Sequence, residues 1–236
     1  MRVIIFDSGP IISLAVNNML WVLDKLKEDF GGEFYIPLSV RKELIDRPIE
    51  SKKFKFEALQ VLNYIRKGTL KVHTETPELT KLTNSLLALV NTCYTCSKEN
   101  FKMIHYAEME AVALAIKLKA EAMVVDERMM RSVVEEPMMV EKIMFGRLHR
   151  TMKFDKVKLR KFKEKTKNIK LIRSIELAVV AYEKGWLNDF LPKKKEVKRP
   201  GKFLLQAVLW ALKLRGASIT QREIDKIVKL ETSSIS

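Results

Sequence analysis

The sequence has few cysteines and no long apolar run, and both shortages exclude classes of protein. Its 236 residues include two cysteines, Cys93 and Cys96, which are too few for a disulfide framework. No window approaches about 18 charge-free apolar residues, so we predict no membrane span. The opening letters MRVIIFDSGP hold an apolar run of four residues that Asp7 interrupts, unlike a signal peptide. These observations favour a cytoplasmic protein without a membrane span.

Acidic residues become scarce in the last hundred positions. The part from Met1 to Glu136 has 19 Lys and Arg against 19 Asp and Glu, whereas the part from Pro137 to Ser236 has 25 against 10. The whole net charge of +15 therefore comes from the second part. Such asymmetry indicates a polyanionic partner. A membrane surface is the weaker interpretation, because the basic part lacks an amphipathic face rich in Trp and Phe.

Short apolar runs alternate with helical patterns along roughly the first 190 residues. Strands are predicted at 3–6, 33–37, 69–73, 122–127 and 169–172. Helices are predicted at 11–26, 38–46, 56–66, 76–90, 106–121 and 175–184, with Thr76 as a possible cap before Pro77. This alternation is typical of a parallel sheet that helices cover on both faces. The sequence therefore predicts an α/β fold.

The second part of the chain departs from this rhythm. The segment 140–170 is dense in Lys and predicts an exposed basic helix or hairpin, and 191–202 reads as a basic linker. A helical pair is predicted over 203–236. Its first helix is apolar almost all round and ends at Gly216, and a capping box from Thr220 to Glu223 opens the second. We expect the first helix to be buried against the core or against a second copy of the chain.

Carboxylates occur where two predicted strands end. Asp7 follows the apolar run 3–6, and Asp126 follows the run 122–125. Glu43 lies on the helix after the second strand, and Glu108 lies in the first turn of the helix before the fourth. Ligands bind at the carboxyl ends of strands in open parallel sheets, so these acids meet in one crevice if the two strands are neighbours. Asp7 could instead cap the helix that follows it.

Four motifs in order resemble the PIN-domain nucleases. They are VIIFDSGPIISLA at 3–15, YIPLSVRKELID at 35–46, HYAEMEAVALA at 105–115 and MVVDERMMRSV at 123–133. The stretch IRSIELAVVAYEKGWL at 172–187 is similar to the last strand and helix of the family. The resemblance covers about residues 1–190, with 140–170 as an insertion. It implies a three-layer α/β/α sandwich with a central, mainly parallel sheet of about five strands, to which this chain adds a C-terminal helical extension.

The resemblance also implies a site and a reaction. It places the acidic positions of the family on Asp7, Glu43, Glu108 and Asp126. A cluster of carboxylates needs a cation, and Mg²⁺ or Mn²⁺ prefers oxygen ligands. The implied activity is that of a metal-dependent endoribonuclease, which hydrolyses phosphodiester bonds in RNA. Residues near these positions with supporting or alternative roles are Ser8, Glu110, Glu127 and Ser174, of which Glu110 and Glu127 are expected to be surface charges or neighbours of the ligands.

The basic segment supplies candidates for RNA contacts. Between Lys142 and Arg173 there are 13 basic and two acidic residues, with three phenylalanines interleaved. This mixture favours nucleic acid, although a solvated face is the plain alternative. The predicted RNA-binding residues are Arg147, Arg150, Lys153, Lys156, Lys158, Arg160, Lys161, Lys163 and Arg173. We expect them beside the acidic crevice.

Other functions stay open at this point. A PIN-like module could bind RNA without cutting it, but a degenerate fold is more apt to lose a carboxylate. A toxin of a toxin–antitoxin pair resembles a bare domain, whereas this chain carries extra segments. A structure-specific DNA nuclease predicts more acids and a helical arch. The lone CxxC motif at Cys93 and Cys96 and the three scattered histidines form no metal-ligand pattern, and a homodimer is left open.

Overall fold

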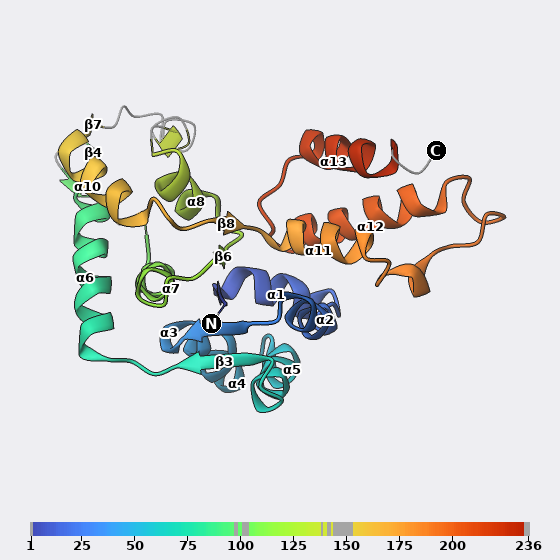
Figure 1. Cartoon of the computed structure of the whole chain (residues 1–236), viewed down its shortest axis with the longest axis horizontal. Coiled ribbons are helices and arrows are strands. Elements are labelled where there is room, and N and C mark those ends of the chain that lie inside the picture. The colour runs from blue at the N-terminus through green and yellow to red at the C-terminus, as the bar shows by residue number, and fades with distance from the viewer. Residues whose placement is uncertain are drawn as a thin grey trace.

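The computed structural model describes residues 2–96, 99–100, 104–137, 139–140, 143 and 153–233. Its centre is a sheet with the strand order β3-β2-β1-β6-β8, and every neighbouring pair is parallel. The strands are β1 Val3–Phe6, β2 Glu33–Pro37, β3 Leu70–His73, β6 Ala122–Val124 and β8 Leu171–Ile172. Helices cover both faces (Figure 1). The predicted α/β/α sandwich with a parallel five-stranded sheet and added C-terminal helices is confirmed.

Alternating side chains of β1 point into two separate cores. Val3 and Ile5 belong to one buried cluster, and Phe6 belongs to the other. Successive side chains of a strand face opposite sides of a sheet, which is why a continuous apolar run is needed here. The strand pairs with β2 on one edge and β6 on the other, so Phe6 lies opposite Val124.

Six helices from both ends of the chain contribute to the core on one face of the sheet. They are α1 Ser8–Val16, α2 Trp21–Phe30, α5 Lys55–Arg66, α11 Ser174–Glu183, α12 Pro200–Leu214 and α13 Gln221–Ser233. The predicted single helix 11–26 is wrong, because α1 ends at Val16 and α2 begins at Trp21. Asn17 donates a side-chain hydrogen bond to the carbonyl of Ser13, and Asn18 adopts a left-handed conformation with φ of 54°. Asparagine tolerates both arrangements, which end a helix.

The opposite face is covered by α6 Pro77–Asn91, α7 Tyr106–Lys117, α8 Arg128–Glu135 and α10 Lys156–Thr166. The predicted cap is confirmed, since the Thr76 side chain accepts a hydrogen bond from the backbone N–H of Leu79. A second, antiparallel sheet lies beyond α6, with the strands β4 Tyr94–Cys96, β5 Glu99–Asn100 and β7 Lys153–Phe154. The sequence did not predict this sheet, because strands of two or three residues leave no periodicity to detect.

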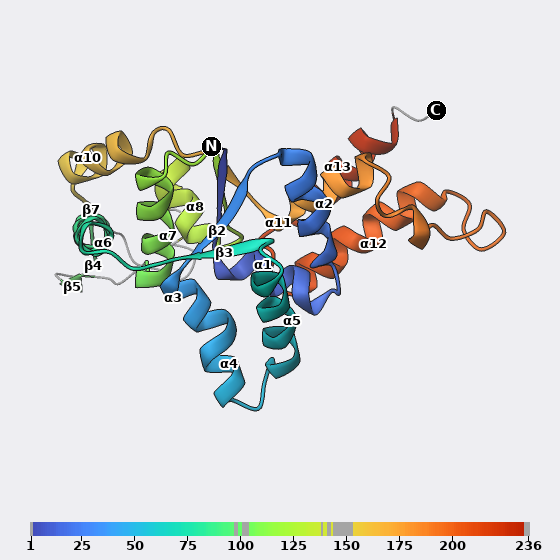
Figure 2. The ribbon, with the colours of Figure 1, turned by 60° about the horizontal axis from the view of Figure 1, so that its bottom comes forward.

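The connection from β2 to β3 contains an unusual turn. It consists of α3 Leu38–Arg41, the π-helical segment η1 Lys42–Asp46 and α4 Arg47–Glu50, and then continues into α5. Figure 2 shows α4 and one end of α5 projecting beyond the sheet. A π-helical turn inside a helix is rare, and those that occur are often found at functional sites. This one carries Glu43.

The C-terminal helices share the core of the sheet. Leu205, Leu209 and Ile224 are buried in the same cluster as Phe6, which confirms burial against the core as one of the two predicted alternatives. The capping box is confirmed by reciprocal hydrogen bonds between Thr220 and Glu223. Helix α12 begins at Pro200, inside the predicted linker 191–202, because proline is favoured at a first helical position. No helix in the described part of the chain is long and apolar enough to cross a membrane.

Candidate active site

The neighbouring strands β1 and β6 bring Asp7 and Asp126 together. The backbone N–H of Asp7 donates to the carbonyl of Val124 at 3.0 Å, so the ladder continues to the first residue after β1. Gly9 lies close to both side chains. A Cβ atom on Gly9 would lie 3.6 Å from Cβ of Asp126 and 3.8 Å from Oδ2 of Asp7. The two strand-end acids therefore meet at the carboxyl edge of the sheet.

Asp126 is held by two serines. Its Oδ1 accepts the backbone N–H of Ser174 at 2.8 Å, and its Oδ2 accepts the hydroxyls of Ser174 at 2.7 Å and Ser13 at 3.0 Å. All three residues are buried. Ser174 was predicted to lie near the site. Ser13 was not predicted to lie near the site. The one feature of the sequence that could have indicated it is a hydroxyl within the apolar helix that follows Asp7.

Asp7 is buried without a complete set of partners. The residue is 4% exposed, and its Oδ1 has no hydrogen-bond partner among the described residues. The pKa of Asp7 is raised to about 6, chiefly by burial and also by the charges of Glu43 and Asp126, while the backbone N–H groups of Ser8 and Gly9 act to lower it. The side chain of Asp7 makes no capping hydrogen bond to α1, although Asp7 occupies the cap position. A buried carboxylate oxygen of this kind favours a proton or a cation.

Glu43 and Glu108 reach the same region from two helices. The hydroxyl of Ser8 donates to Oε2 of Glu43 at 3.0 Å, which joins α1 to η1. Glu108 accepts the backbone N–H of His105 at 2.8 Å in the first turn of α7. The pKa of Glu108 is raised to about 7, chiefly by burial and also by the charges of Asp7, Glu127 and Glu43, while the N–H of His105 acts to lower it. The four predicted acids are therefore electrostatic neighbours.

The remaining two acids have structural partners. Glu127 caps α8, because its side chain accepts the backbone N–H of Met130 at 2.6 Å. Glu110 is 1% exposed and accepts hydrogen bonds from the backbone and the hydroxyl of Ser39, so its prediction as a surface charge is wrong. It lies two positions from Glu108, about 200° round the helix, and faces α3 instead. A cavity of about 440 Å³ adjoins Glu110, Glu43 and His105.

A family model described as a PIN domain matches residues 3–138 of this chain. The chain belongs to the PIN-domain family. Proteins with this domain are generally nucleases, so the chain has a nuclease fold. The match extends from β1 to the end of α8 and includes all four predicted acids, whereas α10, β8 and the C-terminal helices lie outside it. No curated protein and no solved structure matches the chain significantly.

The acids of this PIN domain are suitable ligands for a divalent cation, but among the described residues they are not arranged around a single ion. Carboxylate oxygens are the ligands of hard cations, and the unpartnered Oδ1 of Asp7 offers one. Within the described residues, no three Asp, Glu, His or Cys side chains are placed to hold one metal ion. Glu43 and Glu108 bond Ser8 and His105 instead. Their side chains would have to turn for all four acids to act as ligands.

The predicted RNA-binding residues are spread over several places. Lys156, Arg160, Lys161 and Lys163 are exposed on α10, while Lys158 is half-buried with Nζ 3.4 Å from the carbonyl of Thr92. Arg147, Arg150 and the side chain of Lys153 lie outside the described residues. Helix α10 packs on α6 and α7, and four residues separate its last residue from the first residue of β8. It therefore lies toward the amino edge of the sheet, away from the projecting α4 in Figure 2, so its predicted place beside the crevice is wrong.

Arg173 has a different role from the predicted one. Its side chain is 12% exposed and forms ion pairs with Glu176 and, at 3.2 Å, with Glu223 of α13. The guanidinium also donates to the carbonyl of Ser218 at 3.4 Å. Because these protein groups occupy its donors, Arg173 is not available to an RNA phosphate, and it instead fastens α13 to the end of β8.

Proposed function

We propose that this PIN domain is a metal-dependent endoribonuclease that hydrolyses phosphodiester bonds in RNA. The ligands of Mg²⁺ or Mn²⁺ would be Asp7, Glu43, Glu108 and Asp126. The observation that carries the proposal is the buried Oδ1 of Asp7, which has no partner among the described residues and belongs to a side chain that the charges of Glu43 and Asp126 affect. An anionic oxygen in this position is expensive to keep unless a cation neutralises it.

The residues of the chain prepare the site in distinct ways. Asp126 is oriented by Ser174 and Ser13, so its carboxylate needs little rearrangement to bind a cation. Asp7 and Glu108 hold their protons more tightly than free carboxyls, so below about pH 6 to 7 a cation that binds there displaces protons from them. The bound cation would supply the polarisation of the phosphoryl oxygen and the activation of water that hydrolysis needs.

The exposed cations of α10 have a supporting role in this proposal. Lys156, Arg160, Lys161 and Lys163 are free to contact phosphates of a strand that extends away from the crevice. Such contacts add affinity without sequence preference.

A second candidate function is RNA binding without cleavage. The observation in its favour is that no three possible ligands in the described part of the chain are already placed round one ion. In this alternative the acids stay partly protonated and the fold serves only as a scaffold for the basic surfaces.

Cleavage of an end-labelled single-stranded RNA in Mn²⁺ and in EDTA separates the two. We expect cutting by the unaltered protein in Mn²⁺ alone, and a loss of roughly 100-fold or more in Asp7→Asn and in Asp126→Asn. Asp225→Asn, at an exposed position of α13, is the matched control and should cut normally. RNA binding with no metal-dependent cutting would overturn the enzyme proposal and support the second function.

A further inference from the structure

A cationic pocket lies between α8 and the connection from α12 to α13. Its volume is about 510 Å³, and its charged lining consists of Arg128, Arg131, Lys213 and Glu223. The single acid is already engaged, because Glu223 pairs with Arg173 and bonds Thr220. The charged lining of the pocket therefore consists of three cations and one carboxylate that already has partners.

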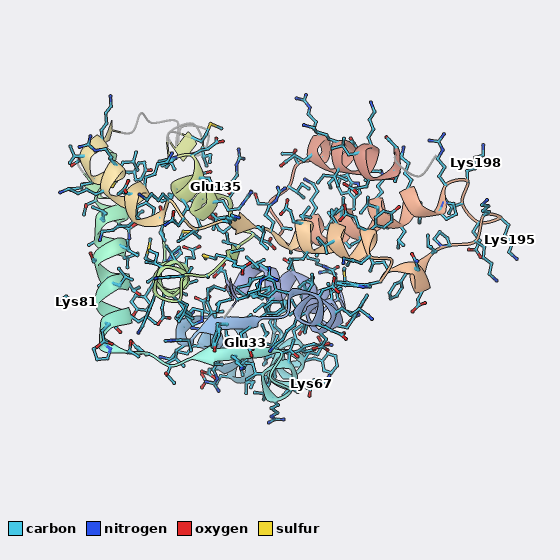
Figure 3. All side chains as sticks on the ribbon, in the orientation of Figure 1. Glu33, Lys67, Lys81, Glu135, Lys195 and Lys198 are labelled. Atoms are coloured by element: carbon cyan, nitrogen blue, oxygen red, sulfur yellow. The ribbon has the colours of Figure 1, made fainter. Side chains whose placement is uncertain are left out.

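Arg131 is the most constrained of these cations. Its Nε is buried without a hydrogen-bond partner in the described part of the chain, and its Nη2 makes only a 3.4 Å bond to the carbonyl of Ser218. Glu135, labelled on α8 in Figure 3, and Glu176 are near enough to favour the charge, but neither forms an ion pair with Arg131. A buried guanidinium N–H without an acceptor is costly, so the position favours an external anion.

The other two cations retain free donors. Arg128 is exposed and has no hydrogen bond or ion pair with any described residue. Lys213 donates one hydrogen bond, at 2.6 Å, to the carbonyl of Ile219, which leaves two N–H donors. Arginine binds phosphate through two parallel N–H groups, and lysine binds it as a point charge.

A short chain of contacts joins this pocket to the carboxylates. Arg128 is two residues beyond Asp126. Arg131 and Arg173 both donate to the carbonyl of Ser218, and the residue after Arg173 is Ser174, which bonds Asp126. The pocket therefore adjoins the acidic crevice, unlike the cations of α10.

We propose that this pocket binds a backbone phosphate of the RNA strand, while the next phosphodiester along the strand lies at the carboxylates. The choice of RNA rests on the proposed function. Any polyanionic substrate would need such a cationic site, because the acids repel a polyanion and nearby cations must offset that repulsion. The C-terminal helices, which lie outside the matched region 3–138, thereby contribute Lys213 and Ser218 to the substrate site.

Binding of a short single-stranded RNA in EDTA tests the proposal without any cleavage. The affinity of the full-length protein is measured over a salt series for Arg128→Gln and for Arg131→Lys, which keeps the charge but loses the planar guanidinium. We expect Arg128→Gln to bind more weakly and to lower the salt slope by about 0.7, the value for one phosphate contact on a single strand. Arg131→Lys should weaken binding with little change in slope. Lys226→Gln, an exposed residue of α13, is the matched control and should leave both quantities nearly unchanged.

The outcomes separate this inference from the proposed activity. Wild-type affinity and slope in both arginine variants, or an equal loss in Lys226→Gln, would overturn the pocket whether or not the protein cuts RNA. If the protein does not cut RNA but the salt slopes change as expected, the proposed enzymatic activity would be overturned and the proposed phosphate pocket would be supported. Thermal stabilisation by inorganic phosphate that Arg128→Gln abolishes, with an unchanged RNA slope, would identify free phosphate as the ligand and overturn the assignment to the RNA backbone.

Discussion

Ser174 bonds both carboxylate oxygens of Asp126, from its backbone N–H to Oδ1 at 2.8 Å and from its hydroxyl to Oδ2 at 2.7 Å. Ser174 begins α11 two residues after the end of β8, so the edge strand of the sheet orients an acid at the end of its neighbour β6. Buried carboxylates with three donors hold their geometry well.

Ser174→Ala should therefore loosen Asp126 without removing it. The backbone N–H bond remains, and the lost hydroxyl bond should lower the free energy of unfolding by about 1–2 kcal/mol. We also expect the Mn²⁺ concentration for half-maximal cleavage to rise by about 10-fold, because groups that orient a ligand tune metal affinity. Ser85→Ala, at an exposed position of α6, is the control. An unchanged Mn²⁺ dependence in Ser174→Ala would show that this hydroxyl is only structural.

The raised pKa values predict how stability varies with pH. Burial raises the pKa of Asp7 from 3.8 to about 6 and that of Glu108 from 4.5 to about 7. The folded protein thus binds these protons more tightly than the unfolded chain, so their contribution to stability is fully present below about pH 4 and is lost as the pH rises through 6 to 7. In EDTA, the melting temperature of Asp7→Asn should fall less over this range than that of the unaltered protein.

Metal should reverse this trend. A cation competes with protons for the same oxygens, so Mn²⁺ should raise the melting temperature more at about pH 8 than at about pH 5.5. Asp7→Asn should respond weakly to Mn²⁺ at both values. Equal stabilisation by Mn²⁺ at both pH values would mean that the metal binds elsewhere.

Substitution of Glu108 should remove activity, whereas substitution of Glu110 should lower stability. Glu108→Gln should abolish cleavage with little change in stability, because the amide oxygen can still accept the N–H of His105. Glu110→Gln should keep the metal dependence but lower stability by about 1–3 kcal/mol, because its buried carboxylate is tied to Ser39. Melting curves and cleavage assays on both variants decide this. Loss of activity in Glu110→Gln alone would show that the wrong glutamate was assigned.

The cations of α10 should matter for long RNA and not for short RNA. The triple variant with Gln at Lys156, Arg160 and Lys163 removes exposed charges on the far side of α7 from the crevice. We expect it to lower the salt slope for an RNA of about 30 nucleotides by up to about 2, at roughly 0.7 per contact, and to leave an RNA of about 6 nucleotides unaffected. An unchanged slope for the long RNA would mean that α10 presents only a solvated face.

Several parts of the fold follow from local patterns in the sequence. A strand buried on both faces needs a continuous apolar run, and β1 and β6 show one with an acid directly after it. Parallel neighbours put these ends at one edge, which makes the convergence of Asp7 and Asp126 predictable. The break at Asn17 and the π-helical turn at Glu43 were not predictable, because both depend on hydrogen bonds and packing that override helix propensity.

The sequence alone determined the layers of the sandwich, the strand ends that carry Asp7 and Asp126, and the excess of positive charge after residue 136. Only the tertiary structure decided what each charge contacts. It joined Ser13 to Asp126, buried Glu110 against Ser39 and paired Arg173 with Glu223, although these partners are between 50 and 113 positions apart. Charge type and periodicity are local properties that a sequence displays. Pairing depends on which groups come within a few ångströms of each other, and this is set by how distant helices pack on the sheet.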